Sequence, residues 1–112
     1  MPIIQCFLDR SIKSSWKNEV LIANKLVDEI GVDEKDLTIQ FIQGVSVAGR
    51  QYGVLVVMYL PSVWTQGGIE RIQLIVQITL CRHLNVEPSG LFLITQVIDS
   101  GHVVCDGRIE KW

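Results

Sequence analysis

Gly31-Val-Asp-Glu-Lys-Asp-Leu37 has a counterpart 54 positions downstream, Asn85-Val-Glu-Pro-Ser-Gly-Leu91, and this repetition predicts how the chain folds. Apolar residues upstream of the two stretches also align, as Leu26 does with Leu80. Each stretch lies between a segment whose apolar residues have helical spacing and a segment with the pattern of a strand. The chain is therefore predicted to consist of two copies of one strand–helix–strand unit.

The segment before each stretch is expected to be a helix. The first helix is expected over residues 12–30, where apolar residues step by three or four and mark one face: Ile12, Trp16, Val20, Ala23, Val27 and Ile30. Ser11 precedes this helix and Thr65 precedes the second, and both residue types suit an N-cap. Gly31 then ends the first helix. The second helix, over 66–84, is apolar almost all round, which indicates burial on more than one side.

Four strands are expected, over residues 2–8, 37–43, 53–60 and 91–98. The third strand does not alternate between polar and apolar residues, which is typical of a strand covered on both faces. A crossover between parallel strands is right-handed, so two such units related by a two-fold axis place both helices on one face of a four-stranded mixed sheet. The opposite face would then be apolar and bare. We predict an α+β fold and an oligomer in which another subunit covers that face.

A chain of 112 residues has room for one hydrophobic core, so we expect a single domain over residues 1–112. Its parts are repeat one over 1–43, repeat two over 53–98 and a C-terminal hairpin over 99–112. The Asp106-Gly107 pair is the hairpin signal. Because a two-stranded hairpin is not stable alone, we expect it to pack on a neighbouring subunit, with Trp112 lining that neighbour's pocket.

Composition argues against several classes of function. The net charge of −2 is small and gives no electrostatic signature of binding to nucleic acid or an anionic membrane. No apolar run is long enough to span a membrane, and none follows a basic stretch as in a secretory signal. The three cysteines lack metal or redox spacing, which favours reduced thiols and a cytoplasmic location. His83 and His102 have no second ligand nearby in sequence, so we expect structural roles for them, and neither a metal nor an organic cofactor.

Pro2 directly follows Met1 and begins the first strand-like run. If Met1 is removed, the chain starts with a secondary amine. An α-amino group titrates around pH 7.7–8.0, close to the pH at which a general base or acid is most useful. A nearby cation lowers the pKa of such an amine and favours the base, whereas a nearby carboxylate raises the pKa and favours the acid.

With Met-Pro-Ile-Ile-Gln at its start, two strand–helix–strand halves and this length, the sequence resembles the tautomerase superfamily. That superfamily includes 4-oxalocrotonate tautomerase, macrophage migration inhibitory factor and malonate semialdehyde decarboxylase. The resemblance spans nearly the whole chain, although only the amino terminus is a specific motif. It implies a homotrimer with active sites at subunit boundaries, and a catalytic role for Pro2 as a base or as a cationic acid.

The resemblance also implies substrate-binding positions. Arg10 matches the arginine that follows the first strand in the oxalocrotonate branch, and Tyr52 lies about where that branch has an aromatic residue. Asp36 and Arg50 match residues of the decarboxylase branch. The sequence departs from both branches, because neither Thr38 nor Tyr52 supplies the second arginine expected there.

Two functions remain open. The first is an enzyme that moves a proton on a small carboxylate substrate, a 2-oxo or 3-oxo acid, by keto–enol tautomerisation or a related decarboxylation or hydration. Arg10 or Arg50 would hold the substrate carboxylate, since a guanidinium binds a carboxylate bidentately. The second is a catalytically silent trimer that binds a ligand or a protein.

Overall fold

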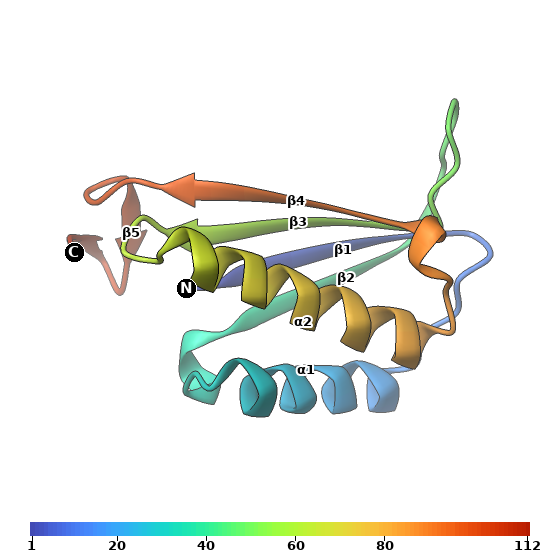
Figure 1. The fold of residues 1–112 in the computed structure, drawn as a ribbon, viewed down its shortest axis with the longest axis horizontal. Helices are drawn as coiled ribbons and strands as arrows, with labels where there is room; N and C mark the ends of the chain where they lie inside the picture. The colour runs from blue at the N-terminus through green and yellow to red at the C-terminus, as the bar shows by residue number, and fades with distance from the viewer.

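The computed structural model describes residues 1–112, and Figure 1 shows a sheet with two helices along one side. The elements in chain order are β1 Ile3–Asp9, α1 Trp16–Ile30, β2 Thr38–Val45, β3 Val54–Pro61, α2 Gln66–Leu84, β4 Leu91–Ile98, β5 Val103–Cys105 and β6 Arg108–Glu110. Short 3-10 helices, η1 Glu34–Asp36 and η2 Pro88–Gly90, precede β2 and β4. No helix has the length and apolar character needed to cross a membrane.

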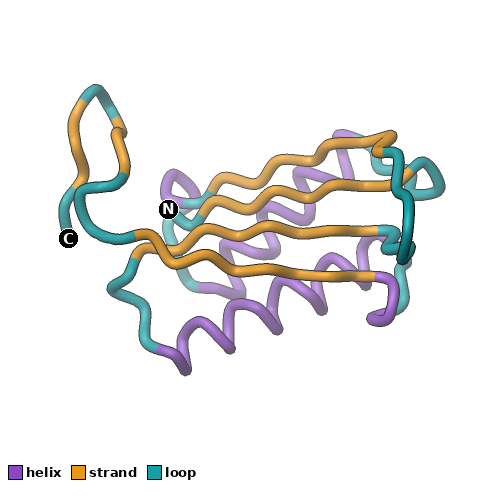
Figure 2. Tube along the Cα trace, turned by 90° about the horizontal axis from the view of Figure 1, so that it is seen from above, coloured by secondary structure: helices purple, strands orange, loops and turns teal.

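The four long strands form a mixed sheet in the order β2-β1-β3-β4. β1 is parallel to β2 and antiparallel to β3, and β3 is parallel to β4. Each parallel pair is joined through one helix, and both helices lie on the same face of the sheet (Figure 2). The predicted α+β fold with two βαβ units is therefore confirmed.

The repeated stretch folds in the same way in both halves. Gly31 follows α1 with a φ of 82°, and its N–H donates to the Val27 carbonyl. Asn85 follows α2 with a φ of 55°, and its N–H donates to the Cys81 carbonyl. Glycine adopts this left-handed region without a Cβ clash, and asparagine tolerates it better than most residues. A 3-10 turn then leads into the next strand in each half.

The start of α1 differs from the prediction. Its N-cap is Ser15, whose hydroxyl accepts a hydrogen bond from the Asn18 N–H at 3.1 Å. Ser11 instead donates its backbone N–H and its hydroxyl to the Asp9 carboxylate, at 2.8 and 2.5 Å. The predicted Ser11 cap is wrong because this local pairing holds Ser11 in the turn after β1.

The buried face of α1 also differs from the predicted one. Ile22, Leu26 and Ile30 are buried, whereas Trp16 is 79% exposed. The predicted face was counted from Ile12, which lies outside the helix. The two faces share Ile30, whereas Trp16 and Val20 of the predicted face are exposed.

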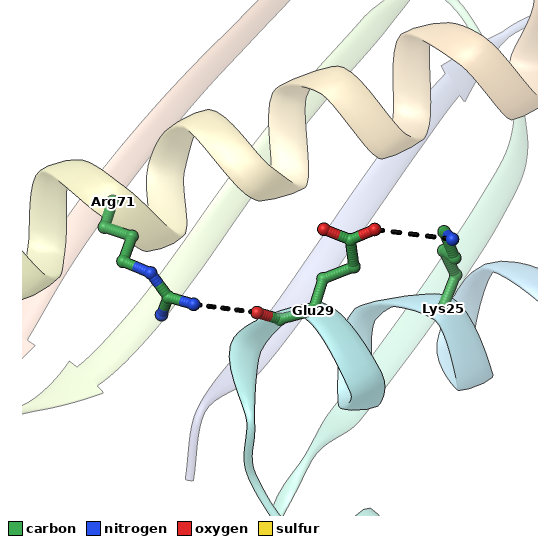
Figure 3. A network of polar contacts seen from close by, with 3 residues as sticks. All are labelled: Lys25, Glu29 and Arg71. Carbon is green, nitrogen blue, oxygen red and sulfur yellow. Dashed lines mark hydrogen bonds and ion pairs between the residues drawn. The ribbon is translucent and has the colours of Figure 1, made fainter.

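α2 has the predicted bounds and the predicted cap, since the Thr65 hydroxyl accepts from the Gly68 N–H at 3.1 Å. Arg71 of α2 reaches the end of α1 and donates to the Glu29 carbonyl at 2.9 Å (Figure 3). It also donates to the Ile30 carbonyl at 3.5 Å. The last carbonyls of a helix lack partners within that helix, so Arg71 caps α1 and joins the two helices.

The helix-covered face of the sheet forms the core. Its fully buried sheet residues are Ile4, Cys6, Leu8, Val54, Val56, Met58 and Leu60. The other face has no covering element in this chain, and Phe92 and Ile94 on it are 41% and 42% exposed. The bare apolar face expected from the unbroken apolar run of β3 is present.

The C-terminal hairpin β5–β6 turns through Asp106 and Gly107, with φ values of 53° and 76°. Two positive φ values are typical of a type I′ turn, so the Asp-Gly signal is confirmed. The hairpin forms a separate two-stranded sheet that stands away from the main one (Figures 1 and 2).

Candidate active site

A cavity of about 770 Å³ lies at the amino terminus. Met1 and Ile3 form part of its wall, together with residues from η1, the end of β3 and the C-terminal hairpin. Sites for small organic ligands have volumes of roughly 300–1,000 Å³. This cavity is therefore large enough for a small substrate.

Pro2 lies directly behind the wall that Met1 forms. Its side chain is fully buried, and its carbonyl accepts a hydrogen bond from the Thr38 N–H at 3.1 Å. Ile3 pairs with Thr38 in the same parallel ladder. Backbone pairing with β2 therefore fixes Pro2, and removal of Met1 would leave the Pro2 nitrogen at the space that Met1 occupies.

η1 brings two charged side chains to this cavity. Asp33 caps η1, because its carboxylate accepts from the Lys35 N–H at 3.2 Å and its carbonyl accepts from the Asp36 N–H at 2.9 Å. β2 starts beside the amino end of β1, since the two strands are parallel. Lys35 and Asp36 consequently both line the cavity at the amino terminus.

The C-terminal segment supplies another part of the wall. The Trp112 indole N–H donates to the Ser62 hydroxyl at 2.9 Å, and the Trp112 backbone N–H donates to the Ser100 hydroxyl at 2.8 Å. Trp112 therefore lines a cavity of its own chain. The place of Trp112 in a neighbouring subunit's pocket stays a prediction.

The lining of this cavity has more negatively charged side chains than positively charged ones. Asp36, Asp106 and Glu110 supply carboxylates, and Lys35 supplies the one cationic side chain of the lining.

A second cavity, of about 440 Å³, lies on the bare face of the sheet. Met1, Ile3, Thr38 and Val103 line both cavities, so the two adjoin at the amino terminus. The second cavity has no charged side chain in its lining; its polar side chains are those of Gln5, Thr38, Gln40, Tyr59 and His102.

Three of the predicted substrate-binding residues lie at the opposite end of the sheet. Arg10 follows β1 and lines a separate cavity of about 300 Å³. Arg50 and Tyr52 precede β3, and the guanidinium carbon of Arg50 lies 5.0 Å from the centre of the Tyr52 ring. Because β1 has 7 residues and a strand rises about 3.3 Å per residue, this end lies roughly 20 Å from Pro2. One protomer thus brings Pro2 and Asp36 together and leaves Arg10, Arg50 and Tyr52 apart from them.

The residues at the far end of the sheet, around Arg10 and Tyr52, make contacts within that end. The Tyr52 ring packs on the Phe92 ring with centroids 5.1 Å apart. Hydrogen bonds from Ser11 hold the pKa of the Asp9 carboxyl below its ordinary value. Asp9 and Arg10 line the same small cavity, which therefore contains charges of both signs.

No cluster of three His, Cys, Asp or Glu side chains is placed to hold a metal ion. All three cysteines are free. Burial raises the pKa of the Cys6 thiol to about 12, so Cys6 stays protonated and unreactive in the core. Cys105 is exposed and lines the amino-terminal cavity.

Sequence patterns missed Lys35 and His102 as lining residues. Lys35 could have been found, because it lies beside Asp36 in the repeated stretch and parallel pairing brings that stretch to the amino terminus. His102 reaches the second cavity from the turn that starts the C-terminal hairpin. The direction in which that hairpin leaves the sheet is a tertiary feature, so no local pattern indicated it.

The sequence matches no protein-family model and no curated protein. Its structure is similar to R7 fused 4-OT, described as a wild-type asymmetric trimer, with a TM-score of 0.79 at 15% identity over 96% of this chain and 95% of that chain. Macrophage migration inhibitory factor from Toxoplasma gondii matches with a TM-score of 0.69 at 13% identity, over 96% and 98% of the two chains. Pt0534, solved after inactivation by 2-oxo-3-pentynoate, matches with a TM-score of 0.78 at 11% identity, over 96% and 94%.

These matches span almost the full length of both chains in each pair. The arrangement of two βαβ units is one that these proteins share with this chain. The chain therefore has the fold of these proteins, which is the fold that the resemblance to the tautomerase superfamily predicted.

Proposed function

We propose that this protein is a tautomerase-superfamily-type enzyme that uses the Pro2 amine, freed by removal of Met1, to transfer a proton on a small oxo acid. The observation that carries this proposal is the burial of Pro2 behind a cavity that Lys35 and Asp36 also line. The reaction would be keto–enol tautomerisation or a related decarboxylation or hydration. Such proton transfers use the protein's own groups, so we expect neither a metal nor an organic cofactor.

Lys35 and the Pro2 amine have distinct roles in this proposal. Lys35 would bind the substrate carboxylate and keep it near the Pro2 nitrogen. Asp36, Asp106 and Glu110 supply the carboxylates of the same lining. A neutral Pro2 amine would act as a general base and a cationic one as a general acid.

The proposed assembly is a homotrimer. The bare apolar face of the sheet supports it, because exposed apolar surface of this kind marks an interaction site, and fused 4-OT is described as a trimer. Arg10, Arg50 and Tyr52 lie roughly 20 Å from Pro2 of their own chain by strand geometry. They would therefore bind substrate only at the amino terminus of a neighbouring subunit.

The alternative is a catalytically silent trimer that binds a ligand or a protein. It is favoured by Thr38 and Tyr52, which stand where the two branches of the superfamily would have a second arginine. In either case, three free cysteines are in keeping with a reducing compartment such as the cytoplasm.

Covalent labelling tests whether the Pro2 amine is free and reactive. Intact mass of protein from its native host should show the loss of one methionine residue. The freed amine should then add across the triple bond of 2-oxo-3-pentynoate, giving one adduct with no leaving group. Peptide mapping should place the adduct on Pro2. Because Cys105 lines the same cavity, Cys105→Ser is the control variant and should still be labelled once.

Kinetics test the proton transfer itself. Phenylenolpyruvate should be ketonised by the wild type and much more slowly by Pro2→Ala, whose primary amine replaces the ring nitrogen after Met1 is removed. Equal rates for the two proteins would remove Pro2 from the mechanism. Complete retention of Met1 in the native host would favour the silent alternative.

A further inference from the structure

Each of the two helices is capped by a side chain of the other. Arg71, near the start of α2, donates to the Glu29 carbonyl at 2.9 Å (Figure 3) and to the Ile30 carbonyl at 3.5 Å, both at the end of α1. Asn18, near the start of α1, donates its side-chain amide to the His83 carbonyl at 3.0 Å, at the end of α2. The last carbonyls of a helix have no partner within that helix, so these contacts fix both ends of the helix pair.

The ends of the two helices differ in charge. The last turn of α1 contains Asp28 and Glu29 and no basic residue. Carboxylates are unfavourable at the C-terminal end of a helix, where cations stabilise the helix dipole. The last turn of α2 contains basic residues of its own, Arg82 and His83. Arg71 therefore supplies from α2 the cation that the last turn of α1 lacks.

The segment that follows α1 carries Lys35 to the amino-terminal cavity. The end of α1 fixes the start of this segment, and β2 fixes its finish, where the Thr38 N–H donates to the Pro2 carbonyl at 3.1 Å. Between these points the residues of η1 are all exposed, and the hydrogen bonds to Asp33 run within the turn. Gly31 joins α1 to the segment, and glycine tolerates many backbone conformations. The place of Lys35 therefore depends on where α1 ends.

The equivalent segment of the second half is held differently. Pro88 occupies the first position of η2, where its fixed φ suits a helical turn. η1 has Glu34 at that position and contains no proline. An apolar residue before the turn packs against the core in both halves, Val32 in one and Val86 in the other, so that contact does not distinguish them. The turn η1 is therefore the less restricted of the two, and it follows the helix end that is stabilised from the other helix.

We propose that Arg71 is a positioning residue, which holds the end of α1 and thereby sets the place of Lys35 in the amino-terminal cavity. This inference rests on the proposed function, in which Lys35 binds the substrate carboxylate. Arg71 does not line that cavity, so it acts through Lys35 rather than on the substrate. Loss of Arg71 would leave the last carbonyls of α1 without a partner, loosen its last turn and let η1 shift.

A double-mutant cycle of Arg71→Met and Lys35→Met tests this role on full-length protein freed of Met1. Ketonisation of phenylenolpyruvate gives kcat and KM for each protein. Arg71→Met should raise KM by about three- to tenfold and leave kcat almost unchanged, because carboxylate binding is lost equally from the ground state and the transition state. In Lys35→Met the same substitution should have no further effect on KM, since the cation that it displaces is already absent. Arg71→Lys should restore most of the affinity, because an ammonium also donates to helix carbonyls.

Asn18→Ala is the matched control. It removes the corresponding cap from α2, and the segment after α2 leads to β4, which starts at the end of the sheet opposite Pro2. Urea titration should show that Asn18→Ala and Arg71→Met both lose stability, whereas KM should rise only in Arg71→Met. If Arg71→Met does not fold, Arg71→Gln, which removes the charge and keeps a donor, takes its place in the cycle.

The outcomes separate this inference from the proposed function. Equal changes of KM in Arg71→Met and Asn18→Ala would refute the positioning role and leave the role of Lys35 intact. The same holds if the losses of the two single variants multiply in the double variant. If Lys35→Met has the KM of the wild type, the assignment of Lys35 in the proposed function fails, and the inference fails with it.

Discussion

Replacing Lys35 by methionine should weaken catalysis on an oxo acid more than any other single loss of a cation within one protomer. Lys35 is the cationic side chain that lines the amino-terminal cavity. Methionine keeps an unbranched apolar chain and removes the charge. The change therefore tests the electrostatic role of Lys35 with little change in packing.

The size of the effect follows from the exposure of the site. An ammonium–carboxylate pair at about 4 Å contributes about 1 kcal/mol in water and about 4 kcal/mol near a protein surface. Lys35 is exposed in the cavity wall, so the lower part of that range applies, about 1.5–2 kcal/mol. Since about 1.4 kcal/mol corresponds to a tenfold rate change, kcat/KM should fall about 10- to 30-fold.

If the site is complete within one chain, Arg10→Met should leave kcat/KM almost unchanged. At roughly 20 Å, its charge contributes about 0.2 kcal/mol in water, and salt reduces this further over a Debye length of about 8 Å. A large loss in Arg10→Met would instead indicate that Arg10 acts on the amino terminus of a neighbouring subunit. Mixed oligomers of Arg10→Met and Pro2→Ala chains would then regain activity, because some sites combine an intact Arg10 with an intact Pro2.

Steady-state ketonisation of phenylenolpyruvate is the assay, and Lys25→Met is the matched control. Lys25 pairs with Glu29 on the surface of α1 at 3.4 Å (Figure 3) and lies outside the cavity. Its replacement should leave kcat/KM unchanged. If Lys35→Met is as active as Lys25→Met, the assignment of Lys35 to the substrate carboxylate is refuted.

Four further predictions concern assembly, two properties of the thiols and a helix cap. Sedimentation at micromolar concentration should show a trimer that Ile94→Asp dissociates, whereas Leu21→Asp, on α1 and 52% exposed, should leave it intact; a monomeric wild type would refute the bare-face argument. Cys105 should react with a thiol reagent in the folded protein and Cys6 only after unfolding. Folding raises the pKa of Cys6 from 9.0 to about 12. The contribution of this thiol to the free energy of unfolding is therefore full below pH 9 and is lost as the pH rises towards 12. Urea titrations of Cys6→Val should not show this loss. Ser15→Ala should lower the free energy of unfolding by about 1 kcal/mol in the same titration, and no change would contradict the assigned cap.

Local chemistry predicted most of the fold. Gly31 marked the end of α1, and Thr65 marked the start of α2, because each residue type satisfies backbone groups at a helix end. The start of α1 could not be predicted in this way. Ser11 and Ser15 are both plausible caps by composition, and the choice between them depends on the carboxylate of Asp9.

The candidate site was predictable only in part, for a different reason. Pro2 and Asp36 come together through the parallel pairing of β1 and β2, which the repeat implied. Lys35 comes with them but had no motif to mark it. Arg10 and Arg50 belong to the other end of the sheet. Their role depends on a subunit arrangement that a pattern within one chain does not specify.

The pseudo-symmetry of the fold explains why the Pro2 amine is separated from Arg10 and Arg50. The two βαβ halves run in opposite directions, so each half starts at a different end of the sheet. Repeat one starts at Pro2, and repeat two starts at Gly53, whose carbonyl accepts from the Asp9 N–H at 3.0 Å. Gly53 lies within the chain and has no free amine, so only one end of the sheet can supply a proton-transfer group of this kind. Arg10 and Arg50 flank the other end. Any site that combines Arg10 or Arg50 with the Pro2 amine must therefore use two chains, and its activity should disappear at concentrations where the oligomer dissociates.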